Sequence, residues 1–175
     1  MPRLRRQVEP LAIQVPGWPL ALFRIAFGLL YLDMALQKAP WVHFGWLKGF
    51  IETEIAHPAI PAVAAFFKSV VLPNFALFGY LTFVVEMALR LALLLGLFTR
   101  LAGLGGFLWQ VNIALGAFNV PGEWYWIWVL LTLPQFCFAV CGAGRIWGLD
   151  AWIRPALARR AEGGARGAAL LRLAT

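Results

Sequence analysis

Four ionisable side chains lie inside long apolar stretches of the sequence: Arg24, Asp33, Glu86 and Arg90. A charged group at the centre of a membrane helix costs at least about 2.5–3.5 kcal/mol, so such groups are tolerated where they pair or serve a function. Two of the four are basic and two are acidic, so their formal charges cancel. The pattern therefore predicts that these charges pair with one another across a bundle of helices.

Three of these charges are expected to share one layer. Glu86 and Arg90 are four residues apart, in the order that favours an ion pair on one helix. At about 1.5 Å per helical residue, Arg24 reaches a similar depth from the same end of the bundle. Gln110 and Gln135, each in a later apolar stretch, come to the depth of Glu86. These five side chains are predicted to form a polar layer inside the bundle.

Asp33 is expected to stand apart from that layer. It lies nine residues after Arg24, about two and a half helical turns, so the two side chains face nearly opposite directions. The partners predicted for Asp33 are Gln37 and Lys38, which follow it at the end of the same apolar stretch.

The chemistry open to such a layer is the binding of a polar headgroup or the relay of protons. The structural alternative is that the ion pairs and amides only hold the helices together. A haem between membrane helices needs ligands within them, whereas His43 and His57 lie outside the apolar stretches. Cys137 and Cys141 would suit a redox pair or a soft metal, but free cysteines in apolar helices usually serve packing. No metal site is expected.

The helices that position these residues are predicted from apolar runs close to the roughly 20 residues that cross a bilayer. The chain is 62% hydrophobic and 13% charged, with a mean hydropathy of +0.76. These values exclude an ordinary soluble domain. The predicted fold is an all-α membrane four-helix bundle in a single domain, residues 1–150. Its four transmembrane spans are residues 18–37, 74–97, 101–118 and 124–141.

The distribution of basic residues predicts the orientation in the membrane. Ten arginines lie at the N-terminus, in the turn after the second span and in the C-terminal segment, against three lysines on the opposite side. The N-terminal ones are Arg3, Arg5 and Arg6. Because basic flanks stay in the cytoplasm, both termini are expected there, in the cytoplasmic (inner) membrane. The net charge of +7 is thus assigned to topology and anionic lipid, and no nucleic-acid partner is expected.

Two regions outside the spans also carry a pattern. Leu47, Phe50, Ile51 and Ile55 repeat at helical spacing among charged residues, which predicts an amphipathic helix in the outer interface. Residues 62–72 are mostly apolar and are predicted to form a second interfacial helix, too short to span. Residues 151–175, rich in Arg, Ala and Gly, are predicted to be a loosely ordered basic cytoplasmic tail.

Three stretches resemble one family of small membrane proteins. The first, residues 24–38, begins Arg-x-x-x-Gly and ends in Lys. The second, residues 84–100, reads VVEMALRLALLLGLFTR, and the third, residues 142–150, reads GAGRIWGLD. In this order and spacing the chain resembles the DoxX/DoxD family, from about Trp18 to the end of the third stretch. One departure is Ala35, where the family tends to have glycine three residues before the lysine.

The resemblance implies a fold and a reaction. The best-understood members of the family are membrane subunits of thiosulfate:quinone oxidoreductase, which passes electrons from thiosulfate to a membrane quinone. The resemblance therefore implies that the chain is a membrane subunit of a quinone-linked oxidoreductase, with quinone as the cofactor. No haem, flavin or metal is expected. A partner redox subunit is expected because the chain has no motif for a group that carries electrons. The sequence also leaves a homo-oligomer open.

The resemblance also suggests roles within the polar layer. Arg24 would hold a quinone carbonyl or an anion and Glu86 would exchange protons, so these two are the expected catalytic residues. The expected quinone-binding residues are Tyr31, Arg90, Gln110 and Gln135. Tyr31 or Trp109 would stack on the quinone ring. The alternative is a non-catalytic membrane scaffold or lipid-handling protein, whose buried charges are structural and whose polar layer is closed.

Overall fold

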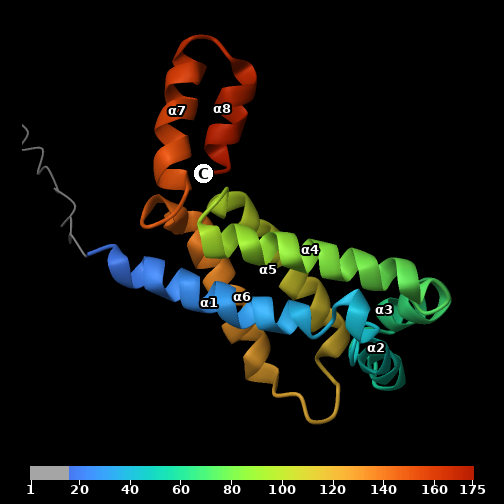
Figure 1. Cartoon of the computed structure of the whole chain (residues 1–175). Coiled ribbons are helices and arrows are strands. Elements are labelled where there is room, and N and C mark those ends of the chain that lie inside the picture. The colour runs from blue at the N-terminus through green and yellow to red at the C-terminus, as the bar shows by residue number, and fades with distance from the viewer. Residues whose placement is uncertain (1–15) are drawn as a thin grey trace, which may run out of the picture.

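The computed structural model describes residues 16–175, except for the side chain of Arg166. These residues form eight α-helices joined by turns, and the described part of the chain contains no strands (Figure 1). The helices are α1 Trp18–Leu36, α2 Leu47–Ala56, α3 Pro61–Phe66, α4 Phe75–Leu95, α5 Thr99–Ala117, α6 Tyr125–Cys141, α7 Asp150–Glu162 and α8 Arg166–Leu173. Three short segments complete them: the 3-10 helices η1 Pro40–Val42 and η3 Ala143–Arg145, and the π-helix η2 Phe67–Val71. The prediction of an all-α protein is confirmed.

The four long helices, α1, α4, α5 and α6, begin and end within two residues of the four predicted spans. Helix α1 packs along α4, and α5 packs along α6. Both pairs come close where one helix has glycine. A Cβ atom on Gly28 would lie 3.1 Å from the backbone of Leu94, and one on Gly103 would lie 2.6 Å from the carbonyl oxygen of Gln135. Small residues at such points let helix backbones approach each other.

The long helices alternate in direction, so the start of α1 lies at the same end of the bundle as the ends of α4 and α6 (Figure 1). Helices α4 and α6 are followed by Gly96 and Gly142, whose φ angles of 65° and 58° lie in the left-handed region that glycine adopts most easily. The segment after α6 is tied to the end of α4, because the amide of Asp150 donates to the carbonyl of Gly96 at 2.9 Å.

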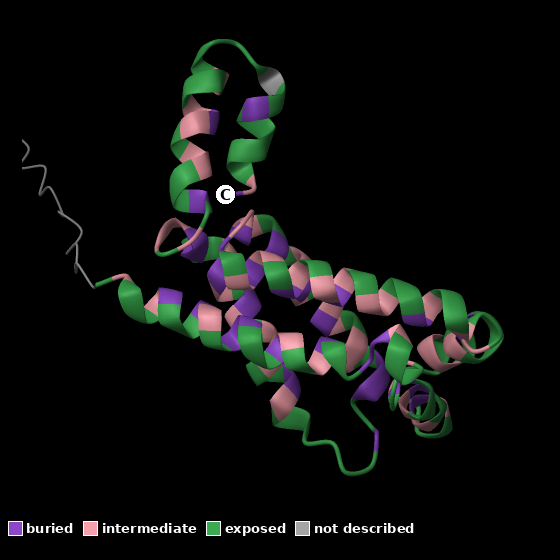
Figure 2. Ribbon diagram, in the orientation of Figure 1, coloured by how far each residue is buried: buried purple, intermediate pink, exposed green. Residues whose placement is uncertain are grey.

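Burial in this bundle is the reverse of what a soluble protein shows. Large apolar side chains are exposed on all four long helices, for example Leu22, Leu77, Leu108 and Val129. The largest fully buried side chains include Arg24, Glu86, Arg90 and Gln135. Figure 2 shows the buried positions on the faces that the helices turn toward one another. Polar groups inside and apolar groups outside suit a protein whose surface meets lipid.

By length and hydropathy, two helices among the described residues qualify as candidate membrane spans, α1 and α4. Helix α6 is apolar but has 17 residues, and α5 carries several glycines and polar residues that reduce its hydropathy. The four predicted spans are therefore all present as helices, and two of them meet these criteria.

The segment between α1 and α4 folds against one end of the bundle. The predicted amphipathic helix is present as α2, and its Leu47 and Ile51 form a buried cluster with Val71 of η2. The predicted second helix is present as α3 and η2. These elements cover the end of the bundle opposite to the start of α1 (Figure 1).

The C-terminal segment departs from the prediction of a loose tail. Residues 150–173 form α7 and α8, which pack against each other as a helical hairpin (Figure 1). The hairpin is anchored because the amides of Arg100 and Leu101 donate to the carbonyl of Ala174, at 3.1 and 3.3 Å. The free amides at the start of α5 thus gain an acceptor, which composition alone did not indicate. The N-terminal arginines that contribute to the predicted orientation, Arg3, Arg5 and Arg6, lie outside the described residues.

Candidate functional site

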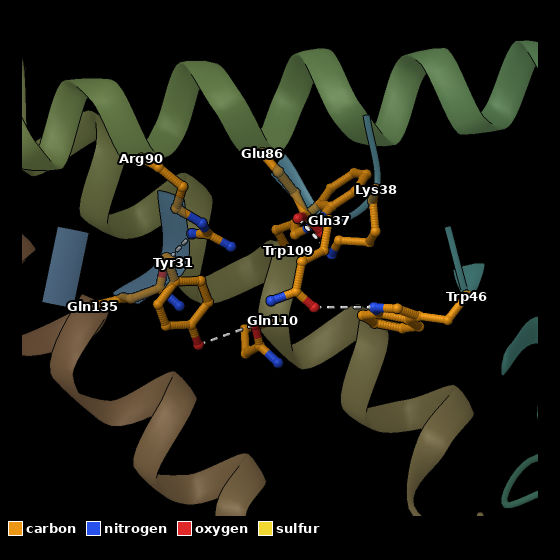
Figure 3. A network of polar contacts seen from close by, with 9 residues as sticks. All are labelled: Tyr31, Gln37, Lys38, Trp46, Glu86, Arg90, Trp109, Gln110 and Gln135. Carbon is orange, nitrogen blue, oxygen red and sulfur yellow. Dashed lines mark hydrogen bonds and ion pairs between the residues drawn. The ribbon is translucent and has the colours of Figure 1, made fainter. Parts of the chain in front are cut away.

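An ion pair lies in the interior of the bundle. Lys38, in the turn after α1, places its Nζ atom 2.5 Å from Oε2 of Glu86 on α4, and both side chains are buried (Figure 3). The other carboxylate oxygen of Glu86 accepts a hydrogen bond of 3.2 Å from the indole of Trp109. The predicted ion pair between Glu86 and Arg90 is wrong. Glu86 pairs across the bundle instead, because Arg90 is held in the opposite direction along α4.

Arg90 is held by two groups on other helices. Its Nη1 atom donates to the side-chain oxygen of Gln135 at 3.0 Å, and its guanidinium lies 4.0 Å from the centre of the Tyr31 ring. The hydroxyl of Tyr31 has two acceptors for its single proton, the side-chain oxygen of Gln110 at 3.2 Å and the carbonyl of Leu131 at 3.1 Å. Figure 3 shows this chain of contacts beside the ion pair. The structure therefore brings together five of the six side chains predicted for the site: Tyr31, Glu86, Arg90, Gln110 and Gln135.

Arg24 does not join them, and its predicted place in the layer is wrong. Its guanidinium donates to the carbonyls of Leu93 and Leu94 at the end of α4, and to that of Trp147 in the turn after η3 at 3.1 Å. Helical side chains lean toward the N-terminus of their own helix, which carries Arg24 away from Glu86. The last carbonyls of α4 lack partners within the helix, so a cation there is stabilised.

Asp33 stands apart from the site, as predicted. It is exposed, and its carboxylate accepts from the amide of Gln37 at 2.7 Å. The second predicted partner, Lys38, turns inward to Glu86 instead. The attraction between a lysine and an exposed carboxylate is weaker than that between a lysine and a buried carboxylate, because solvent screens the exposed charges.

A cavity of about 840 Å³ adjoins the ion pair. It runs from α2 and the α5–α6 turn into the bundle, and its polar lining includes Tyr31, Lys38, Glu86, Arg90, Gln110 and Trp128. Two buried N–H groups of these lining residues have no acceptor among the described residues: Nε of Arg90 and Nε1 of Trp128. Buried donors without acceptors are costly, so an acceptor oxygen of a ligand that reached these two N–H groups would stabilise the site.

A second cavity, of about 220 Å³, also borders the ion pair. Lys38 and Glu86 line it too, together with Trp109, Asn112 and Glu54 of α2. Burial raises the pKa of Glu54 to about 7, because the ionised carboxylate loses its hydration. This carboxyl group, outside the long helices, is therefore able to exchange a proton near neutral pH.

An apolar groove of about 570 Å³ lies between α5 and α6. Its lining is almost entirely hydrophobic, with Phe107, Leu115, Val129 and Leu133 among the residues. Trp128 lines both this groove and the 840 Å³ cavity, so its side chain borders the apolar surface and the polar interior.

A family model described as "TQO small subunit DoxD" matches residues 19–163. The chain belongs to the DoxD family. DoxD proteins are membrane proteins, which agrees with the two apolar helices and the exposed apolar surface. A search of curated proteins found no match, and neither did a search of solved structures.

One of the stretches that carried the resemblance, residues 142–150, joins helix ends in this DoxD protein. The carboxylate of Asp150 accepts from the amides of Phe98 and Thr99, at 2.7 and 2.8 Å, and so caps α5. A Cβ atom on Gly144 would lie 2.0 Å from Oγ1 of Thr99, and one on Gly148 would lie 2.9 Å from the α-carbon of Gly96. The close approach of the helix ends therefore explains the glycines at 144 and 148, and the capping of α5 explains Asp150.

Three features of this DoxD site were missed from the sequence. Lys38 was assigned to Asp33, although its place in the first family stretch was a signal. Glu54 is one of the charged residues within the predicted amphipathic helix, and nothing in that pattern distinguishes a buried carboxyl. Trp128 was not among the residues predicted for the site. Trp109, proposed to stack on a ring, lies outside the lining of the larger cavity and donates to Glu86.

The two cysteines stay separate from this site. Cys137 and Cys141 are free thiols on α6, and Cys141 is exposed. Neither lines any of the three cavities described above.

Proposed function

We propose that this DoxD protein is an integral membrane subunit of a quinone-linked oxidoreductase of the thiosulfate:quinone type. The observation that carries the proposal is the 840 Å³ cavity beside the Lys38–Glu86 ion pair and Arg90. The volume lies within the range of about 300–1,000 Å³ typical of small-molecule sites. A non-catalytic scaffold requires a closed and fully paired polar layer, and the open cavity with spare donors argues against it.

The proposal places all four long helices across the membrane. Helices α5 and α6 expose Leu108 and Val129 to the outside while burying Gln110 and Gln135, as α1 and α4 do with their own polar residues. A helix with this distribution is stable where lipid surrounds the bundle. The excess of basic residues at the ends of α4 and α6 and before α1 then puts both termini on the cytoplasmic side.

The cavity lining fits a quinone headgroup. A quinone has two carbonyl oxygens that accept hydrogen bonds, and the lining offers unpaired donors on Arg90 and Trp128. When bound, the quinone takes up two electrons and two protons to become a quinol. Its isoprenoid tail needs an apolar path, which the groove beyond Trp128 supplies at the lipid-facing surface.

The site residues then take distinct roles. Gln135 and Tyr31 orient the guanidinium of Arg90, which donates to an acceptor oxygen in the cavity. Gln110 lines the cavity and keeps Tyr31 in place. Glu86 and Lys38 are the groups that hold and move a proton there. Arg24 has no role at the quinone, because it does not line the cavity and its Nη atoms donate to carbonyls at the end of α4 and in the turn after η3.

Protons have a route from the outer side in this proposal. Glu54 lines the 220 Å³ cavity that also reaches Lys38 and Glu86. A carboxyl with a pKa of about 7 is suited to pass protons between the outer side and the ion pair. Electrons come from a partner redox subunit, because the chain's sequence has no motif for a group that carries electrons. Oligomerisation with copies of itself remains compatible with this role.

Binding of a short-chain benzoquinone to the purified protein in nanodiscs tests the proposal without the partner subunit. Quenching of tryptophan fluorescence reports binding, because Trp128 lies in the cavity wall. Arg90→Gln should weaken binding about tenfold or more, since a donor in a desolvated site is lost. Arg159→Gln, which removes an exposed arginine on α7, is the matched control and should bind like the wild type. Equal binding by Arg90→Gln and the wild type would refute the assignment of the cavity.

A further inference from the structure

Four arginines converge where α7 and α8 meet the start of α5. Arg100 lies in the first turn of α5, Arg145 ends η3, Arg154 lies on α7 and Arg172 lies on α8. Three of them, Arg145, Arg154 and Arg172, line a cavity of about 220 Å³ together with Asp150. We call this cavity the arginine pocket. It lies at the opposite end of the bundle from α2 and is separate from the quinone cavity.

The arginine pocket has an excess of positive charge. Its acidic lining residue, Asp150, already uses both carboxylate oxygens to accept from the amides of Phe98 and Thr99. Within the described part of the chain, none of the four arginines has an ion-pair partner. Arg145 donates to the main-chain oxygen of Thr175 at 3.0 Å. The excess remains even if that residue carries a free carboxylate, because four guanidinium groups then face two negative charges.

The donors of these arginines are largely unused. The Nε atoms of Arg100, Arg145 and Arg154 are buried, and among the described residues they have no acceptor. Burial, together with the neighbouring Arg154 and Arg100, lowers the pKa of Arg145 below its usual value. Arg100 also donates to the carbonyl of Val140, at 3.5 Å, but crowded cations with few acceptors cost free energy, and a bound anion would reduce that cost.

We propose that the arginine pocket binds a phosphate group, supplied by the headgroup of an anionic phospholipid or by free phosphate. The planar guanidinium fork matches the oxygens of a phosphate and donates two hydrogen bonds at once. The pocket has room for it, since a water molecule takes roughly 30 Å³ in the liquid. It also lies beside the ends of α4 and α6, at the depth where anionic headgroups meet basic residues in the proposed orientation.

The test uses variants that spare the fold. Arg154→Gln and Arg172→Gln each remove a guanidinium that makes no hydrogen bond to the described part of the chain. The matched control is Arg159→Gln, an equal loss of charge at an exposed position of α7. The full-length protein is placed in phosphatidylcholine nanodiscs and its Tm is measured in inorganic phosphate and in chloride at equal ionic strength. A second set of nanodiscs contains phosphatidylglycerol, and native mass spectrometry counts the lipid retained.

We expect the Tm of the wild type to rise with at least one of the two probes. Arg154→Gln and Arg172→Gln should each weaken the apparent affinity about tenfold, and Arg159→Gln should leave it unchanged. A rise with inorganic phosphate in phosphatidylcholine identifies a free anion, and a rise only with phosphatidylglycerol identifies a lipid headgroup. The proposal is overturned if neither probe raises the Tm, or if Arg159→Gln weakens binding as much as Arg154→Gln.

Discussion

Lys38 and Glu86 are 48 positions apart in sequence, and their charged atoms lie 2.5 Å apart inside the bundle. The contact joins the turn after α1 to the middle of α4, and it borders both cavities of the proposed quinone site. An ion pair in a medium of low polarity is strongly coupled, so the loss of either partner leaves a buried charge without compensation.

Breaking this ion pair should destabilise the protein. Lys38→Met is expected to lower the free energy of unfolding by about 3–5 kcal/mol, because Glu86 is left buried and unpaired. The free energy of unfolding of the double variant Lys38→Met/Glu86→Met should fall by less than that of either single variant. Unfolding by denaturing detergent measures the change, and Lys48→Met, at an exposed position, is the control. A double variant less stable than both single variants would contradict the pairing.

Arg24 should matter for stability and not for quinone binding. Arg24→Gln removes the cation that holds the last carbonyls of α4, and should cost about 2–3 kcal/mol. The affinity for a short-chain benzoquinone should stay within twofold of the wild type, in contrast to Arg90→Gln. Thermal unfolding and fluorescence quenching on the same preparation separate the two effects. If Arg24→Gln loses quinone affinity while its stability is unchanged, Arg24 is part of the quinone site and this prediction is wrong.

Glycine should be required where the segment after α6 crosses the end of α4. A Cβ atom on Gly144 would lie 2.0 Å from Oγ1 of Thr99 and 2.6 Å from the carbonyl of Gly96. Gly144→Ala should therefore cost about 3 kcal/mol or more, seen as a lower Tm or a loss of folded protein. Gly49→Ala on α2 meets nothing within 4 Å and should stabilise the protein by up to about 1 kcal/mol. Equal effects of the two substitutions would argue against the described packing.

The carboxyl of Glu54 should make stability depend on pH. Its pKa rises from 4.5 to about 7 on folding, so the folded state binds the proton more tightly than the unfolded state. Stability should then fall as the pH rises from about 4.5 to about 7, by roughly 3 kcal/mol at about 1.4 kcal/mol per pKa unit.

Glu54→Gln should remove this slope, and Glu52→Gln, an exposed residue of the same helix, should keep it. Unfolding followed at several pH values between 4 and 8 makes the comparison. If the stability of Glu54→Gln still falls with rising pH, a different titratable group causes the pH dependence.

Local patterns in the sequence determined the helices of this protein and the membrane character of its surface. The length of an apolar run and the 3.6-residue period are read within one segment, so Trp18–Leu36 and Phe75–Leu95 were predicted to within two residues. The same patterns placed Glu86, Gln110 and Gln135 on inward faces. The helices of the C-terminal segment were missed because their stability comes from packing against each other and against α5.

Only the tertiary structure decided which charges meet. Long side chains extend along the helix axis. The similar depth predicted for the backbone positions of Arg24 and Glu86 therefore did not bring their charged groups together. Arg24 donates instead to the carbonyls at the end of α4, which lack partners within the helix, and the turn after α1 places Lys38 beside Glu86. The burial of Glu54 likewise depends on contacts with residues distant in the sequence. The sequence determined which groups are buried in the bundle, whereas their partners and the cavities between them depend on how helices far apart in the chain pack together.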